Sequence, residues 1–142
     1  MAGFTAHKSI EIAASEDAVW KALTTPELIK QYMFGAEAVS DWTVGSTLVY
    51  RGEWEGENYE DHGTILEIDP PQLLKATYFS PISGKPDVPE NYSVVTYTVD
   101  ADGADRATLT VSQTNNPTAE AATQSESNWS MVLDGIKALL ET

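Results

Sequence analysis

Hydrophobic and polar residues alternate at the beginning of the chain, over residues 4–13. Ile10 and Ile12 fall on one side of this stretch, and Ser9 and Glu11 fall on the other. A repeat of two residues is the signature of a strand with one buried face. We therefore expect the chain to open with such a strand.

The repeat changes to that of a helix after residue 15. Ser15 is a favourable helix N-cap residue, and the two acidic residues that follow it suit the positive end of a helix dipole. Thr25 and Pro26 give a second start signal, because proline is well tolerated at the first position of a helix. The pattern predicts two short helices in tandem between residues 16 and 34.

Alternation returns in the middle of the chain, with turn signals between its segments. The pair Asp102-Gly103 is a strong hairpin signal, and prolines mark residues 80–91 as a loop. The sequence predicts consecutive antiparallel strands with short turns and one buried face. The expected strands cover residues 47–54, 59–68, 73–79, 92–99 and 107–113.

The last segment has helical spacing from residues 116–118 to the end of the chain. Gly135 weakens this helix by about 1 kcal/mol relative to alanine and suggests a close packing contact with the sheet. The order of elements is that of an α+β fold, whose sheet buries one face against the terminal helix. A pocket is expected wherever the side chains of sheet and helix do not meet. The apolar side of the helix consists of Trp129, Val132, Leu133, Ile136, Leu139 and Leu140.

Composition favours a single domain over residues 1–142. Hydrophobic residues make up 42% of the chain, which suffices for a packed core. The 8 basic and 22 acidic residues give a formal charge of -14, which argues against nucleic acid and anionic membranes as partners. The sequence contains no cysteine, so disulfides and thiolate metal sites are excluded.

Targeting signals are not evident in the sequence. The N-terminus lacks a basic start followed by an apolar run, and the apolar stretches are far shorter than the roughly 20 residues of a membrane span. We expect a cytoplasmic protein that is a monomer or a homodimer.

Four segments together carry a family likeness through their order and spacing. They are residues 18–27, 63–71, 95–99 and 128–141. In these segments the chain resembles the SRPBCC (START-like) superfamily, and more narrowly its branch related to the C-terminal domain of the heat-shock-protein-90 ATPase activator. The resemblance implies a helix-grip fold, in which a curved antiparallel sheet wraps around a long C-terminal helix and encloses an apolar cavity. It implies no shared catalytic set.

Aromatic residues on predicted core-facing positions are candidates for a binding site. Tyrosine and tryptophan combine an apolar body with a polar tip and can line a pocket for a mostly apolar ligand, or they can fill the core. The superfamily includes lipid carriers and polyketide cyclases, so we expect a small hydrophobic or aromatic ligand between sheet and helix. The residues expected to bind it are Trp54, His62, Tyr78, Tyr97, Trp129 and Leu133.

His62 and Glu60 form a second candidate site. Counting by twos places both residues on the face of Leu66 and Ile68, which have the character of core residues. A histidine oriented by a carboxylate can act as a general base, so a cyclase- or hydrolase-type enzyme is an alternative function. The other interpretation is a polar pair at a strand end, with Gly63 bending the strand so that its register shifts.

Other chemistry is not indicated by the sequence. It has no nucleophile-elbow or glycine-rich phosphate motif, and its two histidines lack the spacing of metal ligands. We therefore expect no cofactor, no metal, and a binding protein rather than an enzyme. The resemblance leaves one further alternative, a stress-associated, co-chaperone-like module with a chaperone partner.

Overall fold

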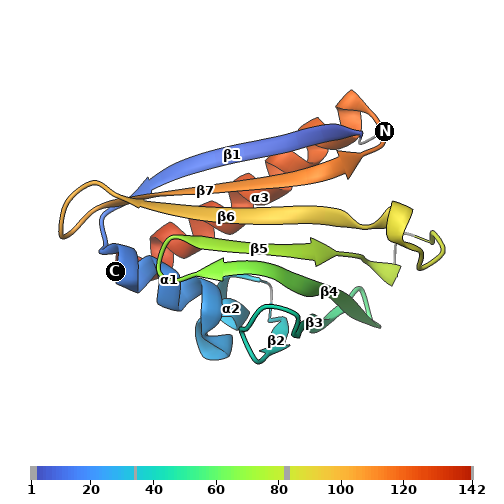
Figure 1. Cartoon of the computed structure of the whole chain (residues 1–142), viewed down its shortest axis with the longest axis horizontal. Coiled ribbons are helices and arrows are strands. Elements are labelled where there is room, and N and C mark those ends of the chain that lie inside the picture. The colour runs from blue at the N-terminus through green and yellow to red at the C-terminus, as the bar shows by residue number, and fades with distance from the viewer. Residues whose placement is uncertain (1–2, 34, 82–83, 142) are drawn as a thin grey trace.

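The computed structural model describes residues 3–33, 35–81 and 84–141. In this part of the chain, a seven-stranded antiparallel sheet curves around a long helix, α3, with two short helices beside it (Figure 1). The predicted α+β helix-grip fold is confirmed. The strands are β1 (Phe4–Ile12), β2 (Glu37–Ser40), β3 (Thr47–Trp54), β4 (Glu57–Asp69), β5 (Leu73–Tyr78), β6 (Ser93–Ala101) and β7 (Ala107–Asn116). The helices are α1 (Glu16–Thr24), α2 (Pro26–Tyr32), the short 3-10 turn η2 (Pro89–Asn91) and α3 (Ala119–Leu140).

The strands lie in the order β1-β7-β6-β5-β4-β3-β2, so the first strand of the chain closes one edge of the sheet beside the last strand. From β2 to β7 the chain runs as a meander, as the turn signals predict. The sequence pattern does not predict β2. This strand has four residues with one buried side chain, Ala38, and is too short to show a period.

The helix α3 lies against the sheet and contacts β1 and β7 (Figure 1). It begins with a cap in which the Ala121 backbone N–H donates a hydrogen bond to Thr118 Oγ1 at 3.0 Å. Its second half packs tightly on the sheet and on α1. The core at this end of the molecule contains Leu133, Ile136, Ile12, Val19, Val99 and Leu109.

Gly135 packs closely, but against α2 and not against the sheet. A side-chain carbon at this position would lie 3.0 Å from Tyr32 Cβ. The Tyr32 hydroxyl donates a hydrogen bond to the Ala22 carbonyl at 2.7 Å, which links α2 to α1. Gly135 therefore makes the expected close contact, but the prediction that its partner is the sheet is wrong.

The strand β4 changes face along its length. Its register against β5 shifts between Ile65 and Glu67, where β4 has one residue more than its partner strand. Ile65 is 1% exposed and Leu66 is 40% exposed, so the face of Ile65 is the inward one before the bulge. Counting by twos back from Ile68 therefore gives the wrong face, because the count crosses the bulge.

Candidate functional site

A cavity of about 470 Å³ lies between the sheet and the middle of α3. Strands β3 to β7 supply most of its wall, and α2 reaches it through its C-cap residue Met33. The residues that α3 contributes are spaced so that they share one side of the helix. They are Ser125, Asn128, Trp129 and Val132. The apolar part of the strand wall includes Leu48, Leu74, Ala76 and Val95.

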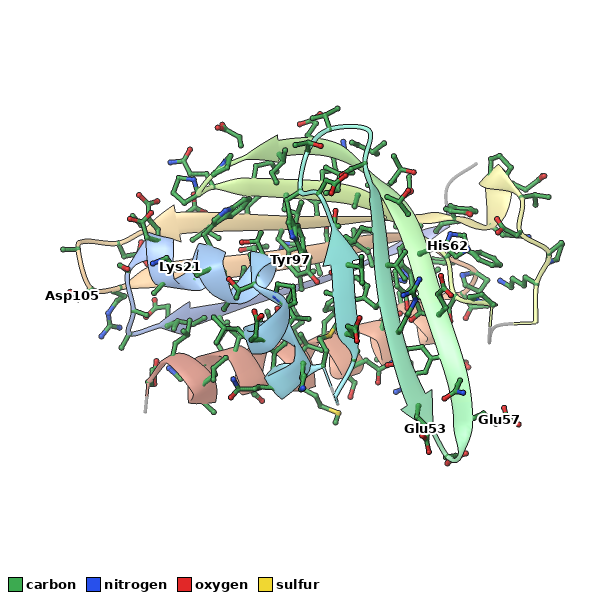
Figure 2. All side chains as sticks on the ribbon, turned by 90° about the horizontal axis from the view of Figure 1, so that it is seen from below. Lys21, Glu53, Glu57, His62, Tyr97 and Asp105 are labelled. Atoms are coloured by element: carbon green, nitrogen blue, oxygen red, sulfur yellow. The ribbon has the colours of Figure 1, made fainter. Side chains whose placement is uncertain are left out.

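Two aromatic rings meet on one side of this cavity. The ring centroids of Tyr97 and Trp129 are 5.8 Å apart in an edge-to-face arrangement. Trp129 Nε1 donates a hydrogen bond to Gln113 Oε1 at 2.9 Å, so the polar atom of the indole is satisfied within the protein. Figure 2 shows Tyr97 between the sheet and the helices. Burial raises the pKa of Tyr97 well above its ordinary value, which keeps its hydroxyl neutral.

Asp61 and Tyr78 form a hydrogen-bonded pair in the wall. The Tyr78 hydroxyl donates to Asp61 Oδ2 at 2.6 Å. Burial, and after it the charge of Asp61, raises the pKa of Tyr78. Asp61 Oδ1 is buried and has no hydrogen-bond partner among the described residues. The wall therefore contains a carboxylate whose capacity to accept hydrogen bonds is largely unused.

Tyr50 and Tyr59 bring two more hydroxyl-bearing rings to the lining. Tyr50 lies opposite Asp61 in the register of β3 against β4, and burial raises its pKa. Burial and the charge of Asp61 also raise the pKa of Tyr59. Among the described lining residues there is no lysine or arginine. The described lining thus combines apolar walls, hydroxyl, amide and imidazole side chains, and one acidic side chain.

His62 contributes to the lining, but its imidazole belongs to a second cluster at the same end of the sheet. His62 Nε2 lies 3.3 Å from Asp87 Oδ2, and the ring packs against Phe79 and Tyr92 with centroid distances of 5.7 and 5.9 Å. The Tyr92 hydroxyl donates to Asp87 Oδ1 at 2.6 Å. In Figure 2, His62 lies beside β4, near the loop that leads to β6. We call His62, Phe79, Asp87 and Tyr92 the outer cluster.

The predicted pairing of His62 with Glu60 is wrong. Glu60 Oε2 lies 3.7 Å from Arg51 Nε, and the two side chains are 53% and 55% exposed. Alternation by twos from Ile68 assigns Glu60 to the inward face because it ignores the β-bulge. In the structure Asp61 occupies the inward position. The geometry therefore does not form the acid–base pair that the enzyme alternative requires.

The remaining residues of the predicted binding set divide into three groups. Leu133 is 2% exposed in the core and lies outside the lining, because its side of α3 meets the packed end of the sheet. The side chain of Trp54 lies outside the described residues. Ligand binding by the remaining four is still a prediction. These residues, which all line the cavity, are His62, Tyr78, Tyr97 and Trp129.

Sequence reasoning missed several lining residues. Tyr50 carries a detectable signal, since it falls on the same side as Leu48 in the alternating strand predicted over residues 47–54. Asp61 carries no such signal, because the bulge after Ile65 reverses the face that the pattern assigns to Asp61. Gln113 is recognisable only from its hydrogen bond to Trp129, which joins residues 16 positions apart.

Metal ligands do not gather in the described part of the chain, where no group of three or more His, Cys, Asp or Glu side chains could hold an ion. The helices described are also too short or too polar to cross a membrane.

The family described as Activator of Hsp90 ATPase homolog 1-like protein has a sequence model that matches residues 13–141. The solution structure of ChR145 from Cytophaga hutchinsonii is 45% identical to this chain, with a TM-score of 0.86, and the match covers 99% of this chain and 96% of that one. Among curated proteins, none matches the chain.

Two further structures share the fold at lower identity. DynU16, a protein in the dynemicin biosynthetic locus, is 19% identical with a TM-score of 0.79, and the match covers 97% of this chain and 47% of that one. The Aha1 dimer from Colwellia psychrerythraea is 17% identical with a TM-score of 0.74, over 97% of this chain and 96% of that one. Because the family match extends over nearly the whole sequence, this chain belongs to the family of Activator of Hsp90 ATPase homolog 1-like proteins.

Proposed function

We propose that this protein binds a small, mostly apolar aromatic molecule in the cavity between the sheet and α3. The observation that carries the proposal is a cavity of about 470 Å³ with aromatic side chains in its wall. Ligand sites in proteins typically have volumes of about 300–1,000 Å³, with apolar walls and a few polar groups that fix orientation. The cavity meets each of these criteria.

The aromatic pair at Tyr97 and Trp129 supports a flat ligand. Rings prefer offset or edge-to-face contacts, and such contacts add about 0.5–1.5 kcal/mol beyond the burial of apolar area. The edge-to-face arrangement of these two side chains fixes the orientation of both rings in the cavity wall. A polyketide is one ligand class that we propose for this cavity, which shares its fold with a protein in the dynemicin biosynthetic locus.

The experiment uses naphthalenemethanol, a neutral two-ring alcohol, and follows its binding by NMR. We expect saturable binding to the wild-type protein. Ala76 is 5% exposed and lines the cavity, so Ala76→Phe fills part of the space and lowers the affinity by at least about tenfold. The matched control is Ala138→Phe on the exposed side of α3, which leaves the affinity unchanged.

Absence of saturable binding to the wild-type protein contradicts the proposal. Equal losses of affinity in the Ala76→Phe and Ala138→Phe variants also contradict it, because the probe then binds somewhere other than the cavity. Both variants are first checked for a folded NMR spectrum, and Ala76→Leu replaces Ala76→Phe if the larger side chain prevents folding.

A further inference from the structure

The Asp61 carboxylate is the most unusual group in the cavity wall. It lies on the inward face of β4, and one of its oxygens accepts a hydrogen bond from Tyr78. The other oxygen is buried and has no hydrogen-bond partner among the described residues. An ionised carboxylate offers about four acceptor positions, so most of its capacity is unused.

No positive side chain compensates this carboxylate within the described lining. The lining contains neither lysine nor arginine. Arg51 lies on the neighbouring strand, but its guanidinium pairs with Glu60 on the outer side, at 3.7 Å. Removing an ionised group from water without a charged partner is unfavourable, even when one hydrogen bond is present. A ligand that brings a positive charge to this position would therefore gain a strong interaction.

We infer that the natural ligand carries a protonated amine next to its aromatic body, and that Asp61 is the residue that selects it. This inference rests on the proposed function of the cavity. The ammonium group donates a hydrogen bond to Asp61 while the aromatic body fills the apolar space.

The choice of an amine over other polar groups follows from charge. A hydroxyl and an ammonium group both donate a charge-assisted hydrogen bond to a carboxylate, but only the ammonium adds the attraction between opposite charges, which is stronger away from bulk water, so an alcohol gains less than an amine. A carboxylate on the ligand would meet Asp61 as a like charge and would be disfavoured. Tyrosine rings from β3 and β4 also line this part of the wall, and their faces attract cations.

The test compares three probes with the same rings and different polar groups: naphthalenemethylamine, naphthalenemethanol and naphthoic acid. For the wild-type protein at pH 7 we expect the amine to bind at least about tenfold more tightly than the alcohol, and the acid to bind most weakly. This order needs no variant, so it can be measured even if a substitution at Asp61 prevents folding.

The variant Asp61→Asn keeps an acceptor for the Tyr78 hydroxyl and removes the charge. It should lower the affinity for the amine by about tenfold or more and change the affinity for the alcohol by less than about threefold. The control is Glu60→Gln, which removes a negative charge from the exposed side chain of the neighbouring residue. It should leave the preference for the amine over the alcohol intact. This control is needed because a chain with a charge of -14 attracts any cation weakly.

The outcomes separate the two proposals. If the alcohol binds in the cavity but the amine binds no better, or if Glu60→Gln reduces the preference as much as Asp61→Asn, the amine inference is overturned and the binding function stands. If none of the three probes binds saturably, the proposed function fails and the inference fails with it.

Discussion

Two tyrosine–aspartate hydrogen bonds at one end of the sheet have the same length and opposite surroundings. The Tyr78 hydroxyl donates to Asp61 at 2.6 Å in the cavity wall, and the Tyr92 hydroxyl donates to Asp87 at 2.6 Å in the outer cluster. Asp61 has a second oxygen that is buried without a described partner, whereas the second oxygen of Asp87 lies 3.3 Å from His62.

The difference shows that burial, and not bond length, decides what each pair can do. The Asp87 side chain is 53% exposed, so water solvates its charge and weakens the interaction with His62. The Asp61 oxygen without a partner is shielded from water, and an interaction made there is screened much less. We propose that the outer pair holds a loop in place and that the inner pair distinguishes one ligand from another.

The largest expected difference between the two pairs is in stability. Tyr78→Phe should lower the free energy of unfolding by about 1.5–3 kcal/mol, because it leaves a half-buried carboxylate, one of whose oxygens is shielded from water, without its described donor. Tyr92→Phe should lower it by less than about 1 kcal/mol, because water replaces the lost donor. Urea unfolding of both variants at pH 7 measures the two values. Equal losses would contradict the distinction between the pairs.

The next largest difference between the two pairs is expected in the ionisation of their tyrosines at alkaline pH. The Asp87 hydrogen bond, followed by burial, raises the pKa of Tyr92 from its ordinary value of 10.0 to about 12, and burial raises the pKa of Tyr78 further. Since both folded-state values are raised, the stability that these groups contribute is fully present below pH 10. It is lost as the pH rises through the folded-state pKa, which for Tyr92 is about 12.

Tyrosinate absorbance follows this titration directly. Tyr92→Phe should remove one tyrosine from the ionisation that occurs while the protein is still folded. Tyr78→Phe should leave that step unchanged, because burial, and after it the charge of Asp61, raises the pKa of Tyr78 above that of Tyr92. If instead Tyr78→Phe removes one tyrosine from the ionisation of the folded protein, the cavity wall is open to water. The distinction between the two pairs then fails.

The smallest expected effect is that of Asp87→Asn. This change keeps an acceptor for Tyr92 and removes the charge that pairs with His62. The free energy of unfolding should change by less than about 0.5 kcal/mol, as is usual for exposed pairs, and the affinity for naphthalenemethanol should change by less than about twofold. Unfolding curves and NMR titration measure the two quantities. A tenfold loss of affinity would place the Asp87 side chain in the ligand site.

Most of the fold could be predicted because periodicity is a strong signal in long elements. The helical spacing of the last segment and the Asp102-Gly103 turn placed α3 and the hairpin of β6 and β7 close to their observed bounds. β2 could not be predicted, since its four residues are too few to show a periodic pattern. The strand is held mainly by its pairing with β3, which the local sequence does not reveal.

The site was harder to predict for one physical reason, the bulge in β4. An extra residue between Ile65 and Glu67 reverses the inward face, so the pattern selected Glu60 where the fold presents Asp61. The aromatic lining was found more readily, because Tyr78, Tyr97 and Trp129 lie on elements without such an interruption. A local insertion of one residue thus changes the chemistry that sequence reasoning assigns to the cavity.

The most direct test of the cavity as the binding site is to map which NMR signals move when naphthalenemethanol is added. The Trp129 indole N–H is a useful reporter, since it is bonded to Gln113 in the wall. We predict saturable shifts at this indole and at the Ala76 and Tyr97 amides, with Tyr92 and Asp87 unchanged. Shifts confined to Tyr92 and Asp87, or shifts that do not saturate, would contradict the account.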